Sequence, residues 1–172
     1  MYYQPRCLLL LGWLGTVFLG GILCVAYQHL PCGPVALFAP VCHSLWEQLK
    51  LIYWPYLLAA LLLNRGRPDG MRPWLLALAA MCALHLSLGW LYHMLLGGEA
   101  AWVDRVLYLS TMAFGFWLPT RFSGPFSGLR WTLPVVLVVV LGLLIALFTL
   151  WPPQSLLFAD LSFAGAWLPL PC

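Results

Sequence analysis

Residues 131–151, WTLPVVLVVVLGLLIALFTLW, contain no charged side chain. A transmembrane α-helix needs about 20 consecutive apolar residues to cross the hydrocarbon core of a bilayer. Because lipid offers no hydrogen-bond partners to the backbone, a run of this kind is expected to be helical. Pro152 and Pro153 follow directly and would end the helix. This stretch therefore predicts a membrane-spanning helix.

Four further apolar runs precede it, and they cover about residues 7–27, 45–63, 74–96 and 103–118. The second run contains Pro55, where a kink is expected because proline cannot donate a helical hydrogen bond. The 172 residues are 63% hydrophobic and 8% charged, with a mean hydropathy of +0.92. An ordinary soluble domain is far less apolar and more charged. We expect one all-α domain over residues 1–172, a polytopic transmembrane helix bundle of about five spans.

The first apolar run superficially resembles a signal peptide, because Arg6 precedes it. It has no small-x-small cleavage site, and it is long enough to cross a bilayer. We therefore expect it to be retained as the first helix.

Basic residues are unevenly divided between the two ends of this five-helix arrangement. One end has Arg6, Arg65, Arg67, Arg72, Arg121 and Arg130, and the other has Lys50 and Arg105. The positive-inside rule then places the N-terminus in the cytoplasm and the C-terminus outside. The outer end would also hold Glu47, Glu99, Asp104, Asp160, His29, His43 and His93. The eight basic residues are too few and too scattered for a nucleic-acid surface.

Residues 40–50, PVCHSLWEQLK, contain the most structured polar pattern. If the helix already includes His43, then His43, Glu47 and Lys50 share one face at about 100° per residue. A His and a Glu at this spacing can bind one metal ion or share a proton. Alternatively, Ser44 caps the helix with Glu47 at capping-box spacing, which leaves His43 outside. Glu47 and Lys50 are then an i, i+3 ion pair.

Two histidines lie in the third run, His85 near its middle and His93 closer to its outer end. An ionisable residue at mid-bilayer is costly and by default faces the bundle interior, so His85 is a candidate for an internal site. The alternative is a neutral imidazole that joins two helices by hydrogen bonds.

The fourth run has polar or small residues every three or four positions, namely Asp104, Tyr108, Thr111 and Gly115. Such spacing places them on one helical face. That face could complete a polar chamber with the third helix, or it could serve ordinary packing between helices. Asp104 also suits the first turn of its helix.

The six cysteines include no CxxC pair, so neither a thioredoxin-like motif nor a zinc knuckle is indicated. Cys32, Cys42 and Cys172 are expected on the outer side, where disulfides persist. Cys32 with Cys42 would close a short loop, and the odd number leaves the pairing open. Residues 154–172 are apolar but broken by Pro169 and Pro171. We expect an interfacial tail there, with a lid over the outer face as the alternative.

Residues 38–51, FAPVCHSLWEQLKL, resemble the signature of an uncharacterised family of small bacterial multi-helix membrane proteins. The family run reads approximately Phe-x-Pro-Val-Asn-Glu-Ser-x-Trp-Glu-His-x-Lys-Leu. Cys42, His43 and Gln48 replace its Asn, Glu and His, so any ligand set would differ here. Residues 152–160 show a weaker likeness to the family's ending. The resemblance implies a small membrane protein of the bacterial plasma membrane and supplies no activity.

Two functional hypotheses follow. The favoured one is a non-enzymatic accessory, transport or scaffold protein, because no catalytic motif is present and each polar residue has a structural explanation. The alternative is an intramembrane metal-dependent hydrolase or a ligand-binding protein with a site at the extracytoplasmic face. Its candidate ligand-binding residues are His43, Glu47, Lys50, His85, His93 and Asp104. Expected partners are the lipid bilayer and a protein or a second copy of the chain; metal and cofactor are left open.

Overall fold

The computed structural model describes residues 5–98, 100–123, 126 and 128–158, and these residues contain six α-helices and no strand. The helices are α1 (Arg6–His29), α2 (Gly33–Phe38), α3 (Leu45–Leu63), α4 (Pro68–Trp90), α5 (Ala101–Trp117) and α6 (Thr132–Leu150). A π-helical segment, η1 (Leu91–Leu95), continues α4. Three short 3-10 turns follow later, η2 (Leu118–Arg121), η3 (Leu129–Trp131) and η4 (Leu156–Phe158). All five predicted runs are therefore helical.

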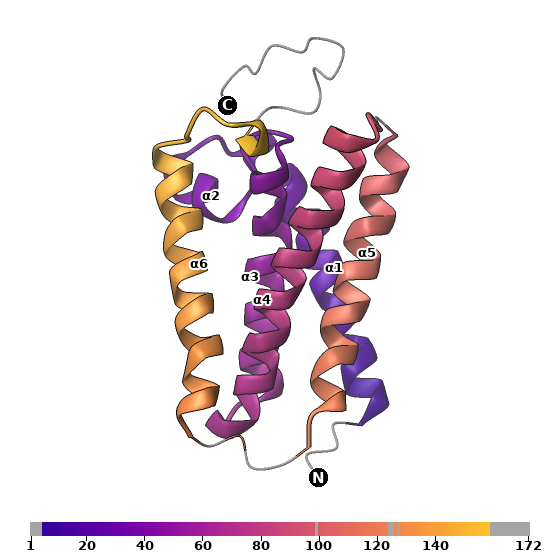
Figure 1. Cartoon of the computed structure of the whole chain (residues 1–172), viewed down its shortest axis with the longest axis vertical. Helices are drawn as coiled ribbons and strands as arrows, with labels where there is room; N and C mark the ends of the chain where they lie inside the picture. Colours follow the sequence, from indigo (N-terminus) through magenta and orange to yellow (C-terminus); the bar gives the residue numbers. More distant parts are fainter. Residues whose placement is uncertain (1–4, 99, 124–125, 127, 159–172) are drawn as a thin grey trace.

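The five long helices run along the long axis of the molecule, and the short α2 lies near the upper end (Figure 1). Helix α4 packs against α3, α5 and α6, so it is the most central element. The first described residue and the last lie at opposite ends of the bundle (Figure 1). The end where α1 begins also carries the six arginines that the sequence analysis grouped together, whereas Lys50 and Arg105 lie toward the other end.

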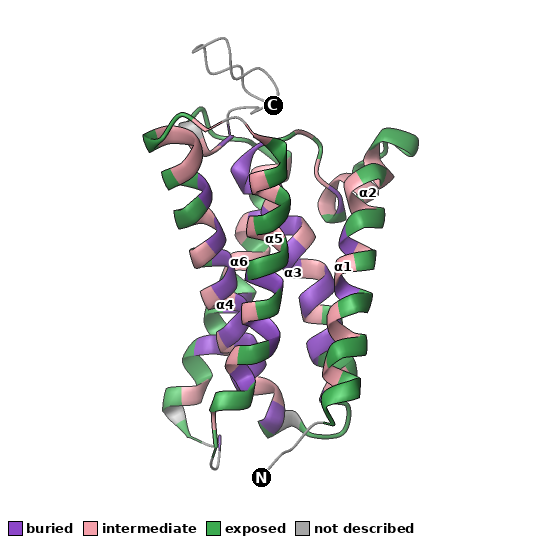
Figure 2. Ribbon diagram, turned by 90° about the vertical axis from the view of Figure 1, so that its right-hand side faces the viewer, coloured by how far each residue is buried: buried purple, intermediate pink, exposed green. Residues whose placement is uncertain are grey.

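Three helices are long and apolar enough to cross a membrane, at Arg6–His29, Asp69–Leu95 and Thr132–Leu150. The first and third are mostly exposed, with 11% and 17% of their most apolar window buried, against 44% for the second. Figure 2 shows the buried positions concentrated where the helices face one another. Helix α5 has only 17 residues, and α3 begins with polar residues that the bundle buries. The count of five spans therefore stays a prediction.

Helix α3 supplies much of the core. Leu49, Ile52 and Tyr56 are fully buried. The Tyr56 hydroxyl donates to the carbonyl of Gly115 in α5 at 2.6 Å, and the Tyr53 hydroxyl donates to that of Val138 in α6 at 2.9 Å. These two tyrosines tie the middle of α3 to α5 and to α6.

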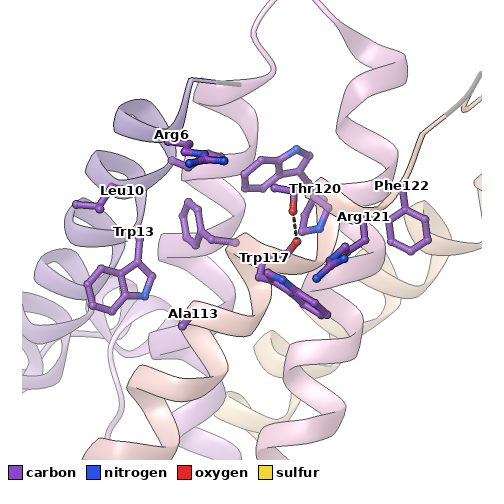
Figure 3. A pocket seen from close by; sticks show the side chains of 12 residues that line it. Arg6, Leu10, Trp13, Ala113, Trp117, Thr120, Arg121 and Phe122 are labelled. Atoms are coloured by element: carbon purple, nitrogen blue, oxygen red, sulfur yellow. Dashed lines mark hydrogen bonds between the residues drawn. The ribbon is translucent and has the colours of Figure 1, made fainter. Parts of the chain in front are cut away.

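The lower end carries a groove of about 820 Å³ between α1, α5 and η2 (Figure 3). At the upper end, η4 returns over the bundle, and the ring of Phe158 stacks on Trp46 with centroids 5.4 Å apart. Most of the predicted interfacial tail, at residues 159–172, lies outside the described residues, as do Glu99, Asp160 and Cys172.

Candidate functional site

Helix α3 begins with a side-chain cap. Ser44 has extended backbone angles, and its Oγ accepts a hydrogen bond from the Glu47 N–H at 3.2 Å. This is the N-cap geometry that satisfies one free N–H of the first turn. His43 consequently lies outside the helix and is exposed. The predicted face of His43, Glu47 and Lys50 is therefore wrong, and the capping alternative describes the start of α3.

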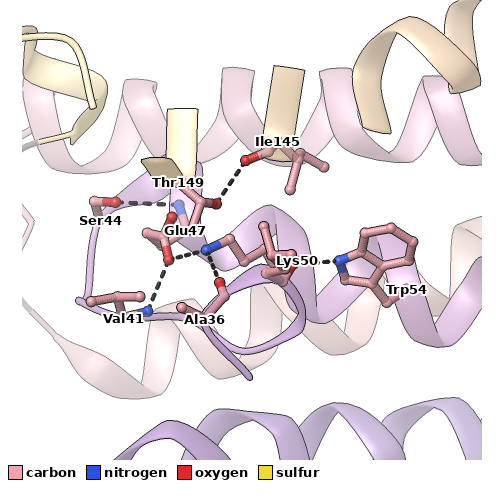
Figure 4. Close-up of polar contacts among 9 residues, drawn as sticks. Ala36, Val41, Ser44, Glu47, Lys50, Trp54, Ile145 and Thr149 are labelled. Atoms are coloured by element: carbon pink, nitrogen blue, oxygen red, sulfur yellow. Dashed lines mark hydrogen bonds and ion pairs between the residues drawn. The ribbon is translucent and has the colours of Figure 1, made fainter. Parts of the chain in front are cut away.

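Glu47 and Lys50 are a buried ion pair that also bonds to backbone. Glu47 Oε2 accepts from Lys50 Nζ at 2.5 Å and from the Val41 N–H at 2.8 Å. Lys50 Nζ also donates to the carbonyl of Ala36 at 2.7 Å (Figure 4). The two side chains are 7% and 0% exposed. A buried pair of this kind is tolerated when further hydrogen bonds satisfy its remaining polar atoms.

We call Ala36, Val41, Glu47 and Lys50 the clasp. The last carbonyls of α2 have no hydrogen-bond donor within so short a helix. The clasp supplies one of the missing donors. Lys50 takes the Ala36 carbonyl, and Trp54 Nε1 donates to the Leu37 carbonyl at 3.0 Å. Helix α2 is thereby held against α3 and α6 at the upper end.

Gln48 directly follows Glu47 in α3, and its side chain points about 100° away from that of Glu47 around the helix. Its Oε1 lies 3.3 Å from Nε2 of His85, which is only 2% exposed. The other ring nitrogen, Nδ1, is buried without a hydrogen-bond partner in the described part of the chain. His85 thus joins α4 to α3, as the packing alternative predicted, but it leaves one polar atom unsatisfied.

His93 lies in the π-helical segment η1, and it contacts two oxygens. Nε2 is 2.8 Å from Asp104 Oδ1 in the first turn of α5, and Nδ1 is 2.8 Å from the carbonyl of Gly98. The Tyr92 hydroxyl accepts from the Ala100 N–H at 3.1 Å. The ring satisfies both acceptors only when it carries both N–H groups. Segments of π-helix are frequent at functional sites.

The two histidine contacts belong to one row of polar groups. His85 and His93 are eight residues apart on α4 and η1, which corresponds to about 12 Å at 1.5 Å per residue. We call Gln48, His85, His93 and Asp104 the histidine row. It extends from the half-exposed Asp104 to the buried His85.

The structure therefore divides the six predicted site residues. Glu47 and Lys50 belong to the clasp, His85, His93 and Asp104 belong to the histidine row, and His43 belongs to neither. The sequence alone did not place Gln48 among the candidate site residues. The one signal for it is that Gln48 stands where the family run has His. Whether any of these residues binds a ligand stays a prediction.

The face predicted on α5 does not form one polar chamber. Tyr108 packs against Gly20 of α1, and its hydroxyl is buried without a hydrogen-bond partner among the residues that the structure describes. Gly115 lies against Met81 of α4, where a side chain would collide. Asp104 is the member of this face that joins the histidine row. The rest of the face serves close approach between helices.

Two further expectations concern the cysteines and metal. Cys42 is disulfide-bonded, whereas Cys32 is free. The pairing of Cys32 with Cys42 is therefore wrong. Within the described ranges, no three His, Cys, Asp or Glu side chains come together as a group that could hold a metal ion.

A family model described as "Family of unknown function (DUF6512)" matches residues 10–167. The chain belongs to this family. The match extends from α1 to beyond η4, so the DUF6512 region includes both the clasp and the histidine row. It confirms the expectation of an uncharacterised family. No curated protein and no solved structure matches the chain.

Proposed function

We propose that this DUF6512 protein is a non-enzymatic integral membrane protein that acts as an accessory or scaffold protein. In this proposal residues 30–44, which we call the outer platform, face the extracytoplasmic side of a bacterial plasma membrane. The six arginines at the opposite end support that orientation through the positive-inside rule. The exposed apolar surfaces of α1 and α6 would contact lipid.

The clasp is the observation that carries the proposal. Glu47 and Lys50 are the charged groups of the family-like stretch, and both are bonded to atoms of this chain. A catalytic carboxylate or amine must instead reach its substrate. The clasp fixes the outer platform onto α3 and α6, which suits a surface that docks a partner in a defined shape.

The partner can be trapped in living cells with a photo-crosslinking amino acid. His43 is the position to use, because it is exposed on the platform and lies outside the clasp. We expect a discrete adduct of constant composition by mass spectrometry, and we expect Glu47→Gln to weaken it by loosening the platform. A crosslinker at Leu143, which is 65% exposed on α6, is the lipid-facing control. Absence of a discrete adduct at position 43 would contradict the scaffold role.

The orientation has its own test. Alkaline phosphatase folds into an active enzyme only outside the cytoplasm, where its disulfides form. An insertion between η1 and α5 should be active, and an insertion between η2 and η3 should be inactive. The reverse pattern would place the platform in the cytoplasm.

A second candidate is a ligand-binding protein with its site at the histidine row. It is favoured by His85 Nδ1, because leaving a buried polar atom unsatisfied costs about 1–3 kcal/mol. A ligand that donates to or accepts from this nitrogen would remove that cost. Metal analysis of the purified protein separates the forms of this candidate. If the wild type contains stoichiometric metal, and the His85→Ala variant loses it while the Glu47→Ala variant keeps it, the metal-dependent hydrolase is supported. If the wild type contains no metal, that form of the candidate is removed.

A further inference from the structure

The groove at the lower end has two cationic side chains at its edge. Arg6 comes from the first residue of α1 and Arg121 from the end of η2, and Figure 3 shows them on opposite sides of the groove. Both are exposed. The ion pairs of the described residues involve neither of them. Two arginines without carboxylate partners that border the same groove form a site for an anion.

One of these arginines is held in place by an aromatic ring. The guanidinium of Arg121 lies over the Trp117 ring, 4.6 Å from its centroid. A stacked guanidinium keeps its N–H donors free at the edge, and it loses less conformational freedom when it binds. Arginine's planar donors suit the oxygens of a phosphate group.

The wall below the arginines is apolar. Leu10 and Trp13 of α1 and Phe116 of α5 line the groove, and Figure 3 shows Leu10 and Trp13 on the same side of it as Arg6. Leu14 and Phe18 of α1, 48% and 72% exposed, extend this apolar surface along the outside of the bundle. An occupant with a charged head and a long apolar part would match both the edge and the wall.

The wall also contains one unused donor. Nε1 of Trp13 is buried and has no hydrogen-bond partner among the described residues. Tryptophan is enriched where a membrane's polar and apolar layers meet, because its ring is apolar and its N–H is polar.

We propose that this groove binds an anionic phospholipid. Arg6 and Arg121 contact the phosphate of the head group, and the acyl chains lie along the apolar wall, which includes the ring of Trp13, and the exposed face of α1. A free inorganic phosphate would use the arginines and leave the wall uncovered. The proposal rests on the membrane location in the proposed function, but it requires no partner protein.

Native mass spectrometry of the detergent-purified full chain tests the proposal. The probes are phosphatidylglycerol and phosphatidylcholine with identical acyl chains. We expect phosphatidylglycerol to bind about tenfold more tightly, because both lipids offer the same phosphate but the choline cation of phosphatidylcholine is repelled by the two arginines. The double variant Arg6→Gln/Arg121→Gln should remove this preference. Arg130→Gln is the matched control, because Arg130 is exposed at the same end and does not line the groove; it should keep the preference.

Two further measurements make the result specific. Trp13→Phe keeps an aromatic ring in the wall but removes an N–H that is buried, so it should leave phosphatidylglycerol binding unchanged. Excess inorganic phosphate should leave the lipid bound. Equal binding of the two lipids, an equal loss in Arg130→Gln, or displacement by inorganic phosphate would each overturn the proposal. A lost crosslink at position 43 with retained lipid preference would count against the scaffold role alone.

Discussion

Buried polar groups on two sides of the first turns of α3 differ in how completely they are hydrogen-bonded. Glu47 and Lys50 face α2, and their carboxylate and ammonium groups contact each other and backbone atoms. Gln48 faces α4, where His85 is equally buried but has a ring nitrogen that no described residue hydrogen-bonds. Burial alone therefore does not identify what a polar residue does. A buried polar residue whose atoms are all hydrogen-bonded stabilises the fold. A residue with an unbonded polar atom can still bind another group.

The largest expected effect comes from breaking the clasp on one side. Lys50→Met leaves the Glu47 carboxylate buried without its cation, so the free energy of unfolding should fall by about 3–5 kcal/mol. Unfolding of the purified protein in mixed micelles, followed by circular dichroism, measures this loss.

The double variant Glu47→Gln/Lys50→Met is the control, because it removes both charges while Gln can still accept from the Val41 N–H. It should recover much of the lost stability. Equal losses in the single and double variants would show that the charges are unimportant and that side-chain packing dominates.

A smaller loss is expected at the helix cap beside the clasp. Ser44→Ala removes the acceptor of the Glu47 N–H and should cost about 1 kcal/mol in the same unfolding assay. Ser44→Thr supplies another neutral capping oxygen and should keep most of the stability. If Ser44→Ala and Ser44→Thr were equally destabilised, the cap would not explain where α3 begins.

The opposite side of α3 should tolerate the loss of its polar pair. His85→Leu removes the unsatisfied Nδ1 together with a long contact to Gln48, so stability should change by no more than about 1 kcal/mol. The double variant Gln48→Leu/His85→Leu should be as stable as the wild type or more so. A loss as large as that of Lys50→Met would make His85 a structural residue like those of the clasp.

The smallest effect is expected at the partly exposed end of the histidine row. The Asp104 side chain is 28% exposed. Asp104→Asn should therefore cost only about 0.2–1 kcal/mol. The difference between variant and wild type should shrink when the unfolding assay is repeated at high salt, because salt screens exposed charges. A salt-independent loss would instead indicate that Asp104 acts through a hydrogen bond shielded from solvent.

The positions of the five long helices could be predicted because each apolar run is long and bounded by charges, prolines or glycines. Helix α2 could not be predicted. Its six residues lack the length for a stable helix. The bonds from Lys50 and Trp54 that complete it come from elsewhere in the chain.

The candidate site was predicted in part for a related reason. Periodicity along one helix correctly placed Glu47 and Lys50 together. It failed for His43, because Ser44 has an extended backbone and the helix begins only at Leu45. The contact between Gln48 and His85 depends on how α3 and α4 are aligned, and a single sequence carries no measure of that alignment.

The dependence of α2 on α3 also sets an order of assembly during synthesis. Residues 33–38 leave the ribosome before Lys50 and Trp54, whose side chains complete α2. A six-residue helix does not persist alone in water. The nascent segment at residues 33–38 must therefore remain unwound until the first turns of α3 have formed. This segment is thus made before the helix that orders it.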